Sequence, residues 1–177
     1  MVTIIVMDSD GTNGAPEETK RRSTDAEHHG RGETMSTPEE NTEVVRQYLN
    51  AFNERDRDAL SAVLAEDVVE HGAHERLHGF EEIAEFLDAH FETFPDYSGT
   101  ADAVIAEGDT VTVRYTVRGT HTGEYQNVEP TGRTVEWTGM AMYRVDNGEI
   151  AEIWIEEDRL GLLRQLEIVD RPAHLRI

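Results

Sequence analysis

The hydrophobic pattern of the chain changes period once, near Tyr97, and this change limits the fold more than any other feature of the sequence. Before it, apolar residues recur at the three- and four-residue spacing of helices; after it, they alternate with polar residues as in half-buried strands. Helices followed by consecutive strands indicate an α+β domain in which helices cover an antiparallel sheet. The length of 177 residues suits one such domain with an extension.

Three helices are predicted before the change of period. A capping box at residues 37–40, with proline at the first helical position, begins a helix that continues to about residue 53. A short helix follows Asp56, and a third runs from Gly79 until Pro95 ends it.

Four strands are predicted after it, near residues 97–107, 110–121, 133–146 and 149–158. Asn147-Gly148 predicts a tight hairpin between the last two, and Gly161–Leu166 predicts a closing helical turn. A sheet that curves over helices encloses a cone-shaped cavity, and small ligands bind in cavities of this kind.

Composition divides the chain into an extension at residues 1–37, a folded domain at 38–170 and a tail at 171–177. The extension is rich in Gly, Ser, Thr, Asp, Glu and Arg, so we expect it to be disordered, although Val2–Val6 could add an edge strand. No segment has the basic start and long apolar run of a secretory signal, or the roughly 20 apolar residues of a membrane helix. We therefore expect a cytoplasmic protein.

The charge of the chain argues against several classes of partner. It has 16 Lys and Arg against 37 Asp and Glu, a net charge of −21 that repels nucleic acids and anionic membranes. Excess carboxylate with Lys20 as the only lysine resembles proteins of high-salt cytoplasm. The absence of cysteine excludes disulfides, a thiolate nucleophile and cysteine-ligated zinc.

His121 stands on the apolar side of the strand predicted at residues 110–121. The odd positions of this strand are mostly Val and Tyr and the even positions are Thr and Arg, so the imidazole points toward an interior or a pocket, where it needs a polar partner. The alternative is a core histidine that is hydrogen-bonded to backbone or to one carboxylate.

Other histidines give weaker signals. His71, His74 and His78 have spacings that invite a metal hypothesis, but intervening glycines place them on a loop or hairpin with no fixed face, and we expect no metal. His71 could instead lie at a polar pocket rim. His90 lies on the apolar stripe of the third helix, where packing is more usual than chemistry.

Three carboxylates, Glu156, Glu157 and Asp158, end the last strand, and periodicity does not decide which of them faces the interior. Asp158 is in phase with Trp154, whereas Glu157 is in phase with Ile155. Any of them could be a solvated surface acid. A carboxyl group beside tryptophan in an apolar cavity would instead have its pKa raised toward values useful for proton transfer.

Several motifs, in order along residues 40–170, add a family resemblance. They are Val68–His71, Val117–Glu124, Pro130–Gly132, Val135–Gly139, Tyr143–Ile150 and Asp158–Leu166. Together they resemble the SnoaL-like polyketide or ester cyclase family, whose fold is the nuclear-transport-factor-2-like (NTF2-like) cone-shaped α+β barrel, with three N-terminal helices packed on a curved antiparallel sheet. The chain departs from the family pattern at Glu167, where glycine is common, and in its long acidic extension.

The resemblance implies roles for individual residues. Asp158 matches the general acid/base of an intramolecular aldol closure, His121 matches the histidine of a Gly-Thr-His-x-Gly element, and His71 matches a histidine after the second helix. We expect Asp158 to remove a proton next to a carbonyl and His121 to stabilise or protonate the oxyanion. The other expected substrate contacts are Tyr48, Phe52, Trp137, Met140 and Trp154.

The expected function is a cyclase or isomerase without cofactor or metal, acting on a small hydrophobic carbonyl compound. The same groups could isomerise a double bond, or activate water to open an epoxide. From another class, the domain could be a non-catalytic ligand-binding or dimerisation module. We expect a homodimer through the outer face of the sheet, for which Ile153 and Ile155 beside Ala151 are candidate contacts.

Overall fold

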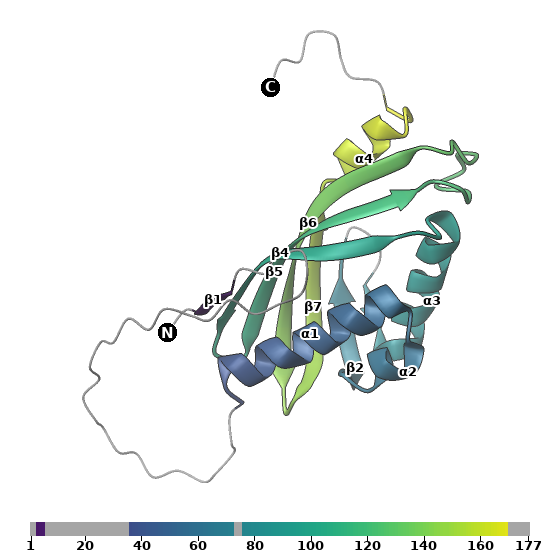
Figure 1. Cartoon of the computed structure of the whole chain (residues 1–177). Helices are drawn as coiled ribbons and strands as arrows, with labels where there is room; N and C mark the ends of the chain where they lie inside the picture. The colour runs from purple at the N-terminus through teal and green to yellow at the C-terminus, as the bar shows by residue number, and fades with distance from the viewer. Residues whose placement is uncertain (1–2, 6–35, 73–75, 170–177) are drawn as a thin grey trace, which may run out of the picture.

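The computed structural model describes residues 3–5, 36–72 and 76–169, as one sheet and the helices that cover it (Figure 1). Its elements are β1 (Thr3–Ile5), α1 (Pro38–Glu54), α2 (Arg57–Ser61), β2 (Leu64–His71), β3 (Leu77–His78), α3 (Gly79–Thr93), β4 (Ser98–Glu107), β5 (Thr110–Thr120), β6 (Thr134–Asp146), β7 (Glu149–Glu157) and α4 (Arg159–Gln165). The predicted α+β class is confirmed. Most of the predicted extension at 1–37, and the tail at 171–177, lie outside the described residues.

The sheet has the strand order β1-β4-β5-β6-β7-β2-β3. The boundaries of β4 to β7 lie within one residue of those predicted, and the edge strand considered at Val2–Val6 is present as β1, which pairs with β4. Strand β2 was not predicted. Its acidic residues interrupt the alternation of apolar and polar side chains that marks a strand. It is held by parallel pairing with β7, a long-range contact that local patterns do not show.

The helices begin where the sequence predicts and cover the concave face of the sheet. Thr37 caps α1 through the expected capping box: its Oγ1 accepts from Glu40 N at 3.2 Å, and Glu40 Oε2 accepts from Thr37 N at 2.7 Å. Figure 1 shows α1 lying across the strands and α3 standing beside β2. Near the start of β6, Leu162 of α4 and the following residue Leu166 pack in one apolar cluster with Trp137.

Two β-bulges interrupt the pairing of the long strands. In β4, Asp102 is the extra residue between Ala101 and Ala103. In β7, Ala151 is the extra residue, because Ile150 and Glu152 pair with consecutive residues of β6. Bulges bend a strand and increase its twist, which accounts for a sheet that curves around α1 instead of lying flat (Figure 1).

The bulge at Ala151 reverses the alternation of side chains in the rest of β7. Ile150 is buried before it, and Ile153 is buried after it. Ile155 and Glu157 therefore share the inner face with Ile153, whereas Trp154 lies on the outer face. The prediction that Ile153 and Ile155 form an outer dimerisation surface is wrong for this reason.

The segment after β5 holds the C-terminal end of α3. The backbone N–H groups of Thr122 and Gly123 both donate to the carbonyl oxygen of Thr93 at 3.1 Å, and Thr93 Oγ1 donates to the carbonyl oxygen of Glu124 at 3.1 Å. Gly123 lies so close to α3 that a Cβ atom there would be 2.4 Å from the carbonyl oxygen of Glu92. Only glycine fits this contact without a shift of backbone.

Replacing Gly123 by alanine is therefore expected to lower the free energy of unfolding by about 1–3 kcal/mol, because the added methyl group overlaps the backbone of α3. Gly99→Ala is the matched control, since the nearest atom to its Cβ would be Asn53 Oδ1 at an ordinary 3.8 Å. Urea denaturation of both variants measures the difference. Equal stability of the two would contradict tight packing at Gly123.

Candidate functional site

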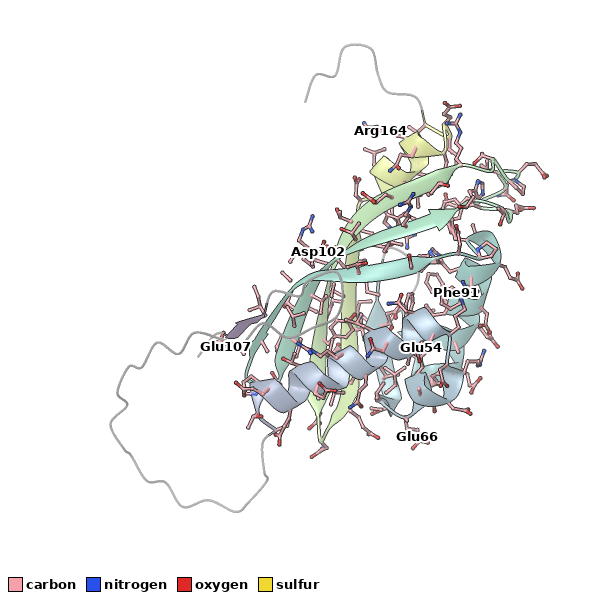
Figure 2. The ribbon with its side chains drawn as sticks, viewed as in Figure 1. Glu54, Glu66, Phe91, Asp102, Glu107 and Arg164 are labelled. Carbon is pink, nitrogen blue, oxygen red and sulfur yellow. The ribbon has the colours of Figure 1, made fainter. Side chains whose placement is uncertain are left out.

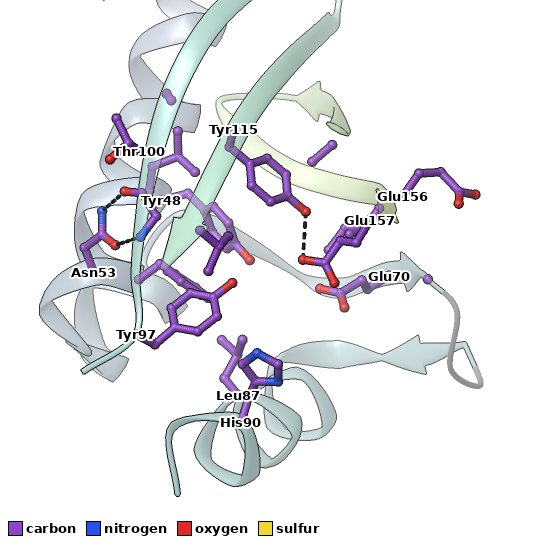
Figure 3. Close-up of a pocket in the computed structure, with 18 of the residues that line it drawn as sticks. Tyr48, Asn53, Glu70, Leu87, His90, Tyr97, Thr100, Tyr115, Glu156 and Glu157 are labelled. Carbon is purple, nitrogen blue, oxygen red and sulfur yellow. Dashed lines mark hydrogen bonds between the residues drawn. The ribbon is translucent and has the colours of Figure 1, made fainter. Parts of the chain in front are cut away.

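A cavity of about 650 Å³ lies between the helices and the concave face of the sheet (Figure 3). Such a volume is typical of sites for small organic ligands, which fall at roughly 300–1,000 Å³. Its apolar lining includes Tyr48, Phe52, Phe86, Leu87, Tyr97, Tyr115, Tyr143 and Ile155, and its charged lining includes Arg46, Glu70, Glu156, Glu157, Asp158 and Arg159. The cone is therefore hollow, and several carboxylates border the space.

Residues of the two neighbouring strands hold Glu157 in the cavity wall. Tyr115 of β5 pairs with Gly139 of β6, and Gly139 pairs with Glu157 of β7. A Cβ atom on Gly139 would lie 2.5 Å from the Tyr115 hydroxyl oxygen, so the absence of a side chain lets the ring lie across β6. The Tyr115 hydroxyl donates to Glu157 Oε1 at 3.2 Å (Figure 3). Trp137 Nε1 donates to the same oxygen at 3.3 Å.

The three candidate carboxylates thus differ in surroundings. The side chain of Glu157 is only 13 % exposed, and its Oε2 lies 3.8 Å from Arg159 Nε. Glu156 and Asp158 are exposed residues that border the cavity at its mouth. Asp158 also caps α4, because its Oδ1 accepts from the backbone N–H of Gly161 at 2.8 Å. The question left open by periodicity has a structural answer: Glu157 faces inward and Asp158 lies at the rim.

His90 of α3 contributes an imidazole to the wall, and Figure 3 shows it pointing toward the cavity. Its ring centroid lies 5.0 Å from that of Tyr97, 5.5 Å from Phe94 and 6.3 Å from Trp137. Burial among these rings, together with the charge of Arg159, lowers the pKa of His90 to about 4. The imidazole is therefore neutral near pH 7.

The phenols of the lining stay protonated. Burial raises the pKa of Tyr97 and of Tyr115 well above the ordinary value, and the nearby charge of Glu157 raises both further. Burial likewise raises the pKa of Tyr48 and Tyr143, with a further contribution from Glu70. At neutral pH these groups are hydrogen-bonding hydroxyls and not phenolates.

His121 directly follows β5 and is fully buried, as the predicted strand pattern implied, but it is not one of the residues that line the cavity. Its Nδ1 lies 3.0 Å from Thr131 Oγ1 and accepts from the Thr131 backbone N–H at 3.2 Å. Its ring packs against Phe94 and Tyr125, and burial lowers its pKa. The structure therefore does not bring His121 and Asp158 to one ligand.

Of the other predicted substrate contacts, Tyr48 and Phe52 line the cavity, and Trp137 lies behind it as the donor to Glu157. Met140 and Trp154 belong to the outer face, where Met140 is 53 % exposed.

His71 also lies away from the cavity. Its ring stacks on Trp154 with centroids 5.3 Å apart, and its Nε2 lies 2.8 Å from Glu152 Oε1, a hydrogen bond that lowers the pKa of Glu152. Because alternate residues of β2 face opposite sides, its neighbour Glu70 is the one that lines the cavity.

The residues missed by sequence reasoning are His90, Glu70, Tyr97 and Tyr115. No local signal marks the bulge that turns Glu157 inward. For Tyr115, a glycine opposite an aromatic residue on the next strand would have been a usable signal once the hairpin register was known.

No group of three or more His, Asp or Glu side chains in the described part of the chain is arranged to bind a metal ion; His74 lies outside that part. None of the described helices has both the length and the apolar character needed to cross a membrane.

A family model for SnoaL-like polyketide cyclases matches residues 42–166, which extend from α1 to Leu166, the residue directly after α4. The chain belongs to this family. Among curated proteins, none matches the chain.

Solved structures support the same fold for this SnoaL-like domain. IdmH, a candidate polyketide cyclase from Streptomyces antibioticus, is 32 % identical, with a TM-score of 0.64 over 72 % of this chain and 98 % of that one. AclR, a candidate hydroxylase from Streptomyces galilaeus, is 25 % identical, with a TM-score of 0.69 over 76 % and 100 %. A candidate SnoaL-like polyketide cyclase from Jannaschia sp. CCS1 shares 20 % identity and a TM-score of 0.70 over 81 % and 100 %. The NTF2-like fold expected from the sequence is confirmed.

The neutral state of His90 predicts how stability depends on pH. Its pKa of about 4 in the folded protein lies below the ordinary value of 6.5. Between these values the unfolded chain binds a proton that the folded protein does not, so stability falls as pH is lowered through this window, by at most about 1.4 kcal/mol per pH unit. The His90→Leu variant lacks this titrating group, so its free energy of unfolding should fall less than that of wild type between pH 6.5 and pH 4. Urea denaturation at these two pH values measures the difference. An equal fall in both proteins would contradict a neutral imidazole at His90.

Proposed function

We propose that this SnoaL-like protein catalyses proton transfer at a carbon next to a carbonyl group, without a cofactor or metal, in an intramolecular aldol-type closure. The substrate class is a small hydrophobic ester or polyketide-like molecule. The observation that supports this most is the aromatic-lined cavity of about 650 Å³ with carboxylates at its mouth and in its wall. Membership of the SnoaL-like polyketide cyclase family supports cyclase-type chemistry.

Asp158 is the proposed acid–base group. Its carboxylate takes the proton as the C–H bond breaks, and the electron pair passes into the carbonyl to form an enolate. The enolate carbon then attacks a second carbonyl of the same molecule, and the proton returns to the new alkoxide. The bond from Gly161 N–H to Asp158 Oδ1 fixes the carboxylate at the rim.

The apolar wall supplies orientation. Two residues of α1 pack their rings against tyrosines of the sheet. The ring centroids of Tyr48 and Tyr143 lie 5.6 Å apart, and those of Phe52 and Tyr97 lie 5.4 Å apart. A folded substrate held against these rings keeps its reacting carbons together and apart from water. We propose that His121 acts from behind this wall, by supporting Phe94 and the end of α3, and not by contact with substrate.

The proposed reaction is tested by proton exchange. The wild-type protein is expected to accelerate deuterium incorporation at the α-carbon of 1-tetralone in D₂O, followed by NMR. Asp158→Asn should slow this by about 100-fold or more, the usual range for loss of a general base. Asparagine is an equally good helix N-cap, so the variant removes the base and keeps α4 intact.

Glu156→Gln is the matched control, because Glu156 is also an exposed acid at the mouth. Equal exchange by wild type and Asp158→Asn would remove Asp158 from the mechanism. Binding of the ketone without exchange would favour the alternative of a non-catalytic ligand-binding module, and turnover of epoxides alone would favour water activation by the same carboxylate.

We also propose that the protein is cytoplasmic and that it forms a homodimer through the outer face of β6 and β7. Met140 and Met142 of β6 are 53 % and 38 % exposed, and Met142 pairs with Trp154 of β7 on that face. Two exposed thioether groups beside a half-buried indole on the neighbouring strand form an apolar patch of the kind that marks protein–protein contacts.

Met142→Asp is therefore expected to convert a dimer to a monomer, measured by size-exclusion chromatography with light scattering in molar salt, which screens the acidic charge. Leu160→Ser is the control, since Leu160 is 47 % exposed but lies in α4, away from the patch. An unchanged mass for Met142→Asp would contradict this interface.

A further inference from the structure

The proposed mechanism needs a hydrogen-bond donor for the oxygen that becomes negative. His121 does not line the cavity, whereas His90 does. It projects from the last full turn of α3 into the lining, opposite the β7 strand that carries Glu157 (Figure 3). Hydroxyl and imidazole groups in a largely apolar cavity are the groups that orient a ligand.

The two histidines differ in burial: His121 is fully buried away from the cavity, whereas His90 is half-buried and lines it. The Nδ1 atom of His121 is engaged by both the hydroxyl and the backbone N–H of Thr131. The ring of His90 is instead surrounded by the faces and edges of Phe94, Tyr97 and Trp137, and it borders the open space. The surroundings of His90 therefore fix the plane of its imidazole while the cavity receives its polar edge.

The position of His90 is set by the segment from Gly119 to Gly123. The backbone N–H groups of Thr122 and Gly123 donate to the carbonyl oxygen of Thr93, about one turn beyond His90 in α3. Phe94 contacts the rings of both His90 and His121, at 5.5 and 5.7 Å between centroids. The Gly-Thr-His-Thr-Gly motif thus places the end of α3, and His90 with it.

Charged and titratable groups approach His90 from several elements. Arg159 at the start of α4 acts on it electrostatically, Tyr97 of β4 packs edge-on against it, and Glu157 of β7 lines the same space. Arg46 of α1 and Glu70 of β2 complete the charged lining. The low pKa that burial gives His90 leaves it neutral near pH 7, with one N–H.

We propose that His90 is a second catalytic residue of this protein, whose imidazole N–H donates a hydrogen bond to the substrate carbonyl oxygen and to the enolate that forms from it. This assignment rests on the proposed proton-transfer function. The α-proton passes to Asp158, the electron pair moves onto the carbonyl oxygen, and His90 keeps its own proton throughout. A fixed donor aimed at a developing oxyanion in a water-poor site lowers the barrier without reorganisation.

The test compares two ligands that differ in the charge on the oxygen. The first is 1-tetralone, a ketone, and the second is the 1-naphtholate anion, a planar analogue of the enolate, studied at a pH above the pKa of 1-naphthol. His90→Leu removes the donor and keeps the volume, and His90→Gln restores a side-chain N–H. We expect His90→Leu to weaken binding of 1-naphtholate by about tenfold or more and binding of 1-tetralone by less than about threefold, measured by titration calorimetry. His90→Gln should recover most of the loss.

Exchange kinetics supply the second readout. His90→Leu is expected to lower kcat for α-deuterium exchange by about 100-fold with KM changed by less than about threefold, and His90→Gln to return it to within about tenfold of wild type. His78→Leu is the control, because His78 is exposed before α3 and makes no side-chain capping bond. Should His90→Leu not fold, His90→Phe, which suits the surrounding rings, replaces it.

Equal weakening of binding of the two ligands, no binding of 1-naphtholate by wild type, or a His90→Gln variant as impaired as His90→Leu would overturn the assignment. Because the ligand comparison measures binding alone, it stands apart from the Asp158 experiment. A selective loss of 1-naphtholate binding in His90→Leu together with unchanged exchange in Asp158→Asn would support the His90 contact and reject Asp158 as the base.

Discussion

The extra residue Ala151 in β7 is the constraint on which the cavity depends. Without it, the alternation that buries Ile150 would carry Trp154 inward and leave Ile155 and Glu157 on the outer face. With it, the inner face of the strand ends in a carboxylate that Tyr115 and Trp137 hold by hydrogen bonds. The next residue, Asp158, is then free to cap α4 at the rim. One bulge therefore sets both the lining of the hollow cone and the order of its acids.

A second constraint operates at the opposite wall. The C-terminal end of α3 is held by backbone donors of the segment after β5, and Gly123 allows the two segments to approach closely. Close packing of this kind transmits position from one element to the next. His121, buried beside Phe94, belongs to this support. A motif that resembles a catalytic signature thus has a clear structural task here, which is to hold the helix that carries His90.

The sequence predicted the elements better than it predicted the site. Capping at Thr37, the Asn147-Gly148 hairpin and the period change at Tyr97 are local signals, and they located α1 and the four long strands closely. Strand β2 has no clear alternation of apolar and polar residues, and the parallel partner that holds it lies far along the chain. The roles of His71, Trp154 and Met140 were misplaced because two-residue periodicity does not say which face is inner, and a bulge changes the answer within one strand.

The central claim is that a small carbonyl ligand enters the cone and meets its inner face. The most direct test is an NMR measurement of nuclear Overhauser effects between the ketone 1-tetralone and methyl-labelled protein. Contacts from ligand protons to the methyl groups of Leu87 and Ile155, both of which line the cavity, are the predicted result. Contacts confined to the methyl groups of Met140 and Met142 on the outer face, or none at all, would contradict the account.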